Sequence, residues 1–206
     1  MLVTFEGIEA TGKSTLIAAV AEELSTLDGS VLVTREPGGT PLGDSLRALF
    51  VDPAFEVDPI AEVMLLNASR AQLVAEVIAP ALKERTIVLC DRFFDATVAY
   101  QGFGRGLNVE SLLEICLMAT HRIAPELTFL LDLPPEVSRA RVLARGDADR
   151  LEREDVEFHT RVREGYLTLA ARFANRYVVL DATQPPEVLA AAASAELRRR
   201  RSAPLL

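Results

Sequence analysis

Short apolar runs alternate with longer segments of helical periodicity along most of the chain. The apolar runs predict strands at 2–5, 31–34, 86–90, 126–132 and 176–181. Apolar positions three and four apart predict helices at about 14–26, 42–50, 59–83, 109–122, 135–145, 154–174 and 186–201. Because strands that alternate with helices usually form a parallel sheet covered on both faces, we expect an α/β fold with a central, mostly parallel, five-stranded sheet.

The chain length and the lack of long linkers predict a single domain over residues 1–206. Half of the 206 residues are hydrophobic, which is enough for a substantial core. In parallel α/β sheets, ligands bind at the carboxyl ends of the strands. The segments that matter most for function are therefore those that follow the predicted strands, at 6–14, 35–40, 91–101, 132–135 and 181–183.

The first of these segments carries a phosphate-binding motif. Residues 7–14 read Gly-Ile-Glu-Ala-Thr-Gly-Lys-Ser and fit G-x-x-x-x-G-K-[ST], with a predicted strand before and a predicted helix after. In such a P-loop, backbone N–H groups surround the phosphates, Lys13 reaches the β- and γ-phosphates, and Ser14 binds Mg²⁺. The alternative is a chance glycine-rich turn, which the two matching flanks disfavour. We expect a nucleoside triphosphate to bind Gly7, Ile8, Glu9, Ala10, Thr11, Gly12, Lys13, Ser14 and Thr15.

An acidic and a basic residue end the third predicted strand. Asp91 follows an apolar run, and an aspartate at that strand end supports Mg²⁺ directly or through water in this architecture. The alternative is an ordinary aspartate at a strand end. Arg92 is unsuited to a core position, which favours a phosphate contact. We therefore expect Ser14 and Asp91 at a metal, and Lys13, Asp91 and Arg92 among the catalytic residues.

Further arginines lie where phosphate groups would be met. Arg35 follows the second predicted strand, and Arg47 lies in the next predicted helix. A break between two predicted helices, at about 144–152, contains a glycine and short polar residues. It predicts a mobile lid that brings Arg145 and Arg150 over a transferring phosphate. The alternative is a pair of helices with solvated ion pairs, and this explanation is preferred for the arginines at 153, 161 and 163.

Two helix faces predict a pocket for a nucleobase and its sugar. Leu66 and Arg70 are four residues apart in the predicted helix 59–83. Thr97, Tyr100 and Gln101 have the i, i+3, i+4 spacing of a single face. An arginine, a glutamine, a threonine and an aromatic ring suit a base and a sugar, although packing in the core explains Tyr100 nearly as well.

Composition disfavours several other classes of function. The net charge of −8 gives no overall footprint for nucleic acid, and no apolar run approaches the ~20 residues that span a membrane. Cys90 and Cys116 lie in apolar surroundings and are expected to be reduced, as in a cytoplasmic protein. The P-loop begins so early that no signal peptide is expected. Two histidines are too few for a histidine metal site.

Taken in order, the motifs resemble those of the thymidylate kinase family. The segments that carry the resemblance are residues 5–14, Arg-Glu-Pro-Gly-Gly-Thr at 35–40, Asp-Arg at 91–92 with Ala-Tyr-Gln-Gly at 99–102, and Leu-Asp-Leu at 131–133. They occur in the family's order and spacing from residue 1 to about 181. The resemblance implies a P-loop NTPase fold and a homodimer. It also implies Mg²⁺-dependent transfer of the γ-phosphoryl group of ATP to dTMP, giving dTDP for dTTP biosynthesis.

The resemblance also implies roles for individual residues. Arg139 matches the arginine that stacks on the adenine of ATP, and the segment at 181–183 lines the same base. The family carries its catalytic arginine either in the P-loop or in the lid. Because Ala10 follows the P-loop carboxylate, the chain resembles the bacterial type, whose catalytic arginine is in the lid. Arg150 is then expected as the main transition-state contact and Arg145 as the second.

On the acceptor side, the resemblance implies a complete dTMP site. The P-loop glutamate faces the 3′-hydroxyl, three arginines surround the phosphate, three side chains read the thymine edge, and a tyrosine packs against the sugar where a ribose 2′-hydroxyl would lie. The residues expected at dTMP are Glu9, Arg35, Arg47, Leu66, Arg70, Arg92, Thr97, Tyr100 and Gln101.

Two positions depart from the family pattern. Leu66 stands where the family usually has a phenylalanine stacked on thymine, and Ala96 stands where it usually has a serine. A leucine covers the ring but lacks the aromatic contribution, about 0.5–1.5 kcal/mol. These changes bear on base affinity and selectivity, and neither touches the phosphate machinery.

Three alternative functions remain to be weighed at this point. A kinase for another nucleoside monophosphate, such as dUMP or a purine nucleotide, is encouraged only by Leu66. A GTPase-like regulator would need an Asn-Lys-x-Asp motif, which the sequence lacks. An inactive nucleotide-binding protein is disfavoured by the intact set of Lys13, Ser14, Asp91 and Arg92.

Overall fold

Five strands form one parallel sheet at the centre of the protein. The computed structural model describes residues 1–26, 30–146 and 148–202; Asp147, inside the expected lid, lies outside them. The strand order is β2-β3-β1-β4-β5, and every neighbouring pair is parallel. The strands are β1 Leu2–Glu6, β2 Val31–Arg35, β3 Ile87–Asp91, β4 Leu127–Asp132 and β5 Tyr177–Asp181. The predicted sheet is thus confirmed, and each strand agrees with its expected bounds to within one residue at either end.

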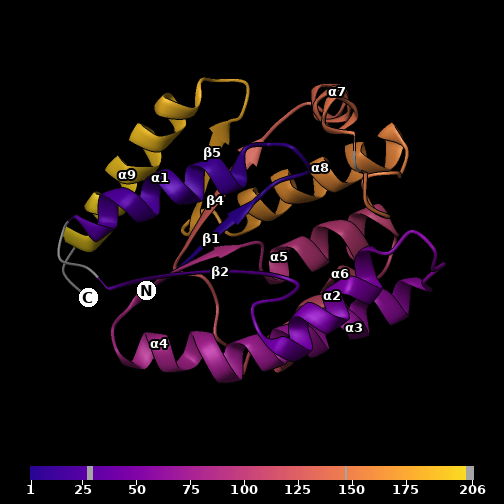
Figure 1. Ribbon diagram of the computed structural model, residues 1–206, viewed down its shortest axis with the longest axis horizontal. Coiled ribbons are helices and arrows are strands. Elements are labelled where there is room, and N and C mark those ends of the chain that lie inside the picture. The colour runs from indigo at the N-terminus through magenta and orange to yellow at the C-terminus, as the bar shows by residue number, and fades with distance from the viewer. Residues whose placement is uncertain (27–29, 147, 203–206) are drawn as a thin grey trace.

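Side chains of alternate strand residues pack into two separate hydrophobic cores, one on each face of the sheet. In β1, Val3 and Phe5 join the core beneath α1 (Lys13–Ser25) and α9 (Pro186–Ser202), which lie side by side (Figure 1). Leu2 joins the core on the opposite face. Because successive residues of a strand point to opposite faces, a continuous apolar strand can serve both cores, and such runs are what the sequence shows. Helices therefore cover both faces, as expected.

The second face is covered by a larger set of helices. The predicted helix 59–83 is confirmed. Its α-helical parts are joined by a π-helical turn at Val74–Ile78, with no gap between them. The helix pair at 94–104, which the apolar pattern did not predict, follows β3 directly and lies against α8. The elements of this face are α3 Pro59–Leu73, η1 Val74–Ile78, α4 Ala79–Lys83, α5 Phe94–Thr97, η2 Val98–Gly104, α6 Val109–Ala119 and α8 Val156–Arg172.

The remaining helices border the ligand edge of the sheet. Helix α2 (Pro41–Val51) packs on α3, and α7 (Pro135–Arg145) leads into the expected lid segment. Two helices are shorter than predicted. Helix α6 ends at Ala119 because His121 and Arg122 adopt left-handed backbone angles, with φ of 50° and 62°. Helix α8 starts at Val156 because the Asp155 side chain caps it by accepting from the Phe158 N–H.

Two further observations bear on expectations from composition. Cys90 and Cys116 are both free and buried. In the part of the chain that the structure describes, no helix is both long enough and apolar enough to cross a lipid bilayer.

Candidate active site

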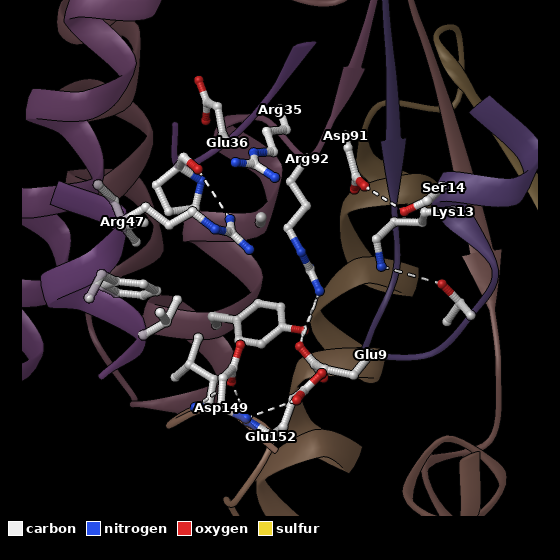
Figure 2. A pocket seen from close by; sticks show the side chains of 18 of the residues that line it. Glu9, Lys13, Ser14, Arg35, Glu36, Arg47, Asp91, Arg92, Asp149 and Glu152 are labelled. Atoms are coloured by element: carbon white, nitrogen blue, oxygen red, sulfur yellow. Dashed lines mark hydrogen bonds and ion pairs between the residues drawn. The ribbon is translucent and has the colours of Figure 1, made fainter. Parts of the chain in front are cut away.

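A cavity of about 580 Å³ lies at the carboxyl ends of β1, β2 and β3. The P-loop closes one side, and α2, α3 and the helix pair after β3 close the other (Figure 2). Most of the residues expected from the sequence meet there. Those that line the cavity are Glu9, Ala10, Thr11, Gly12, Lys13, Ser14, Thr15, Arg35, Arg47, Leu66, Arg70, Asp91, Arg92, Thr97, Tyr100, Gln101 and Arg145.

The P-loop owes its shape to two glycines with backbone angles that other residues rarely adopt. Gly7 has φ of 137°, and a Cβ there would lie 2.5 Å from the carbonyl oxygen of Leu131 on the neighbouring strand. Gly12 has φ of 92° and is the residue just before helix α1. The loop therefore fits closely against β4 and delivers the chain into α1, whose N-terminus carries positive potential toward the cavity.

Lys13 folds back over its own loop. Its Nζ donates to the carbonyl oxygens of Gly7 (3.2 Å) and Ile8 (2.9 Å), and it lies 3.4 Å from the hydroxyl of Thr11. Burial, helped by the charge of nearby Arg92, lowers the pKa of Lys13 to about 8. A buried ammonium held only by neutral oxygens attracts an anionic ligand strongly.

Ser14 and Asp91 come together as the sequence predicted. Pairing of β1 with β3 places Asp91 opposite Phe5, at the base of the P-loop. The hydroxyl of Ser14 donates to Oδ2 of Asp91 at 3.3 Å (Figure 2). One hydroxyl and one carboxylate suit Mg²⁺, which keeps several waters and binds one or two protein oxygens beside substrate phosphates. The described residues include no cluster of three or more acidic, histidine or cysteine side chains that could hold a metal without a substrate.

Arg92 lies at the centre of the cavity wall. Its Nη1 donates to the Gly7 carbonyl (2.9 Å) and the Tyr166 hydroxyl (3.1 Å), and its Nη2 lies 3.1 Å from both Glu9 Oε1 and the Tyr100 hydroxyl. Its backbone is left-handed, with φ of 65°. Such angles in a residue with a Cβ are uncommon and gather at functional sites. The strand end thus turns the guanidinium into the cavity, where Figure 2 shows it between the P-loop and the side chain of Arg47.

Glu9 is held from three directions. Its Oε1 accepts from Arg92 and from the Tyr100 hydroxyl, and its Oε2 lies 3.1 Å from Nε2 of His159 on α8. Burial alone would raise the pKa of the Glu9 carboxyl, but His159 and Arg92 outweigh it and lower the pKa to about 2. Glu9 is therefore ionised at every pH at which the protein would work.

Arg70 is fully buried and fixed at each of its nitrogens. Its Nε donates to Glu36 Oε2 (2.8 Å), its Nη1 to Asn67 Oδ1 (2.9 Å), and its Nη2 to Thr97 Oγ1 (2.9 Å). The spacing of Leu66 and Arg70 placed both in one cavity wall, as predicted. These contacts hold the guanidinium of Arg70 in one position in the cavity wall.

The arginines on the far side of the cavity are less constrained. Arg47 donates from Nη1 to the Pro37 carbonyl at 3.1 Å, next to the cis Glu36–Pro37 peptide bond. Burial and the neighbouring Arg35 charge lower the pKa of Arg47. The Arg35 side chain is 57% exposed and lies 3.6 Å from Asp44. Two repelling guanidinium groups without a close buried carboxylate suit a phosphate dianion.

Leu66 shares its wall with an aromatic ring that the sequence analysis missed. Phe50, at the end of α2, lines the same cavity, as does Ala96. The helix pattern 42–50 was visible in the sequence, but nothing in it indicated that its last residue faces the ligand space. Leu66 offers a base less apolar surface than an aromatic residue would, and Phe50 on α2 supplies part of that difference.

The two lid arginines expected from the sequence lie differently in the structure. Arg145 lines the cavity, and its Nη2 forms a close ion pair with Glu152, at 2.5 Å. Arg150 does not line the cavity: its Nε donates to the Phe50 carbonyl (3.0 Å) and its Nη1 to Glu62 (2.5 Å). A buried carboxylate on α3 thus holds the Arg150 side chain away from the P-loop, and which lid arginine contacts the transferring phosphoryl group stays a prediction.

Arg139, expected at the adenine of ATP, stays a prediction. It is exposed on α7 and does not line the cavity. Arg141 instead contacts the P-loop, donating to the carbonyls of Ala10 (3.1 Å) and Ala182 (3.3 Å). Residues two apart on an α-helix point about 200° apart, so the two arginines face different ways. Helical phase was the signal that could have found Arg141, because it lies three residues after Ser138, whose hydroxyl donates to the Glu9 carbonyl.

Sequence reasoning also missed His159 and two lid carboxylates. Asp149 and Glu152 line the cavity (Figure 2). His159 is buried on α8, seven residues before Tyr166 and thus on the same helix face, and both side chains reach the network around Arg92. A polar residue and a tyrosine seven apart on an otherwise apolar face were the available signal.

Replacement of His159 by glutamine should make stability less dependent on pH. Burial would lower the pKa of His159, but its contacts with Glu9 raise it overall, so the folded state binds the proton more tightly than the unfolded chain. The stabilising contribution is complete below the usual value near 6.5 and is lost as pH rises through the raised pKa. Urea unfolding between about pH 6 and pH 9 measures the difference between wild type and His159→Gln.

The matched control for that comparison is His121→Asn, because His121 is exposed and its left-handed backbone suits asparagine. Its curve should run parallel to that of the wild type. Parallel curves for His159→Gln as well would mean that the contact with Glu9 contributes no pH-dependent stability.

Comparison with known proteins agrees with this geometry. A family model described as thymidylate kinase matches residues 5–193. Thymidylate kinase of Deinococcus radiodurans is 48% identical over 93% of this chain and 93% of its own, and that of Trichlorobacter lovleyi is 49% identical over 97% and 98%. The crystal structure of thymidylate kinase from Ehrlichia chaffeensis, 32% identical, matches with a TM-score of 0.78 over 96% of this chain and 98% of that chain. The chain belongs to the thymidylate kinase family.

Proposed function

We propose that the protein transfers the γ-phosphoryl group of ATP to the phosphate of dTMP, giving dTDP and ADP. The observation that carries this proposal is the presence of two anion subsites in one cavity. Lys13 and Ser14 lie on one side, Arg35 and Arg47 on the other, and Arg92 between them (Figure 2). A nucleotide switch needs one phosphate site, whereas transfer between two nucleotides needs two that face each other.

The reaction requires positioning and charge neutralisation more than acid–base chemistry. A phosphate monoester has a second pKa of ~6 and is largely dianionic at neutral pH, so the attacking oxygen needs no base. The cationic side chains of Lys13 and Arg92 offset the repulsion between donor and acceptor phosphates and hold them in line. With its pKa lowered to about 2, the Glu9 carboxylate is a weak base, and the acceptor phosphate is already deprotonated, so Glu9 is not needed as a base.

Mg²⁺ fits the donor set at the P-loop. Ser14 and Asp91 would hold it, with phosphate oxygens and water completing the coordination. When bound, the ion neutralises charge on the β- and γ-phosphates.

The acceptor nucleoside would lie along α3 and the helix pair after β3. Glu9 would accept from the 3′-hydroxyl, and Tyr100 would pack on the sugar, because its own hydroxyl is directed at Glu9. Arg70 would meet an oxygen at the thymine edge, and Leu66 would cover the ring. These roles follow the family resemblance and are supported by the shared cavity wall.

A panel of acceptors tests this function. ADP release from ATP and Mg²⁺ should be fast with dTMP, weaker with dUMP, and slow with ribo-TMP, dCMP, dGMP and AMP. Leu66 makes the ratio of dTMP to dUMP the value most open to change, since it lacks the ring-stacking contribution. A preference for another nucleoside monophosphate would refute the assignment of the base pocket but would still support phosphoryl transfer. ATP binding without turnover of any acceptor would leave a regulator instead.

Removal of the Arg145 side chain should slow the reaction more than removal of Arg150. Arg145 lines the cavity on the lid, where a guanidinium meets the charge of a transferring phosphoryl group. By analogy with arginine fingers, Arg145→Ala should lower kcat by about 10³-fold, with a smaller loss for Arg150→Ala. Steady-state ADP release at saturating substrates measures both. Arg172→Ala, at an exposed ion pair with Glu110, is the unaffected control. A larger loss in Arg150→Ala would instead support the order expected from the sequence.

A homodimer formed through α2, α3 and α6 completes the proposal. These helices pack against one another in pairs and expose Leu49, Ile60, Met64 and Met118, each at least 49% accessible. Large exposed apolar side chains on adjoining helices are typical of an interface. Sedimentation equilibrium should give about twice the chain mass of 22.5 kDa. Met64→Glu should shift the protein toward monomer, whereas Val188→Glu, equally apolar and exposed on α9, should not. A monomeric wild type would refute the proposal.

A further inference from the structure

Glu62 is a buried carboxylate that stands outside the cavity but touches a residue that lines it. It lies on α3, and none of its surface is exposed. Its Oε2 accepts from Nε2 of Gln101 at 2.8 Å, and its Oε1 accepts from Arg105 (3.1 Å) and Arg150 (2.5 Å). A carboxylate buried this deeply has to be compensated, and the two guanidinium groups provide the charge. The contact with neutral Gln101 is not needed for that compensation.

The contact with Glu62 determines which end of the Gln101 amide is available to a ligand. A carboxylate only accepts hydrogen bonds, so the group that faces it must be the NH₂ of Gln101. The amide oxygen is then directed elsewhere. Gln101 is fully buried and lines the cavity, and its Oε1 is buried without a hydrogen-bond partner among the residues that the structure describes. The contact with Glu62 thus holds the NH₂ end, and the unpartnered oxygen is the acceptor that the side chain has left for a ligand.

An acceptor at this place sorts pyrimidine bases by their edge. Thymine and uracil carry an N3–H donor beside O4, whereas cytosine carries an unprotonated N3 beside an amino group. Arg70, in the same wall, offers only donors and suits O4. A cytosine would thus meet an acceptor with an acceptor and a donor with a donor. A buried mismatch of this kind is costly because both groups lose their water.

We propose that Glu62 is a positioning residue for base selection, which fixes the Gln101 amide so that its oxygen selects bases with an N3–H group. Glu62 itself touches no substrate. The inference rests on the proposed function, because it assigns a determinant of selectivity within the dTMP site. A purely structural role in anchoring Arg105 and Arg150 would instead affect every acceptor to the same degree.

The test compares acceptor selectivity in wild type and Glu62→Gln. A glutamine at position 62 can offer its own NH₂, so the Gln101 amide is free to turn over and present its NH₂ to cytosine N3. Measured as kcat/KM, the preference for dTMP over dCMP should fall about tenfold or more, while the ratio of dTMP to dUMP, which share the N3–H, stays the same. An equal loss for all three acceptors would overturn the proposal.

Two further variants separate the amide from the lid. In a Gln101→Ala background, Glu62→Gln should no longer change the preference for dTMP over dCMP, because the oriented group is absent. Arg150→Gln removes another partner of the same carboxylate and should leave that preference as in wild type. A change in preference that persists without Gln101, or that Arg150→Gln reproduces, would refute the proposal.

A milder variant keeps the test decisive if Glu62→Gln fails to fold. Glu62→Asp retains the charge for Arg105 and Arg150 but withdraws the acceptor from Gln101, and it should also lower the preference for dTMP over dCMP. An unchanged preference in folded Glu62→Asp would count against the proposal. Failure of wild type to phosphorylate dTMP is a different outcome, which would overturn the proposed function itself.

Discussion

The ion pair between Glu9 and Arg92 is the contact on which the geometry of the cavity depends. It joins the P-loop after β1 to the residue that ends β3, and it is reached by Tyr100 from the helix pair after β3 and by His159 from α8. Each partner comes from a different element, so the pair fixes those elements relative to one another. The two opposite charges also compensate each other in a place that is largely shielded from water. A site that binds two polyanions contains several cationic side chains that repel one another. Protein groups such as Glu9 compensate this charge before any ligand binds.

Much of the fold and of the phosphate site followed from sequence. Parallel strands buried on both faces are mostly apolar, and β1, β3 and β4 are short, mostly apolar runs that differ clearly from the amphipathic helices between them. The P-loop was equally legible, since its function depends on local backbone shape and on glycines at fixed offsets. Asp91 and Arg92 could be placed because the carboxyl ends of all strands in a parallel sheet lie at the same edge, where ligands bind.

The parts that the sequence could not predict are side chains whose direction is decided by distant partners. Arg150 was assigned from its place in a helix break, but its direction is set by Glu62, 88 residues away. Arg139 was assigned by motif spacing, which carries no information on the phase of α7, whereas the P-loop contact seen in the structure is made by Arg141, two residues later. His159 gave no local motif because its role arises only where α8 crosses the P-loop. The helix pair at 94–104 was not predicted from the apolar pattern, although the spacing of Tyr100 and Gln101 from Thr97 did place these side chains on one face.

The way Lys13 is folded back on its own loop has a consequence for the cost of binding. The side chain is already ordered and already hydrogen-bonded, to the carbonyls of Gly7 and Ile8. Long lysine side chains lose up to about 2 kcal/mol of rotamer entropy when they are fixed, and here that loss belongs to folding instead of to ligand capture. A triphosphate need only exchange carbonyl oxygens for its own around an ammonium that stays in place. The loop thereby acts as an internal substitute for its ligand, and the site is assembled before the nucleotide enters.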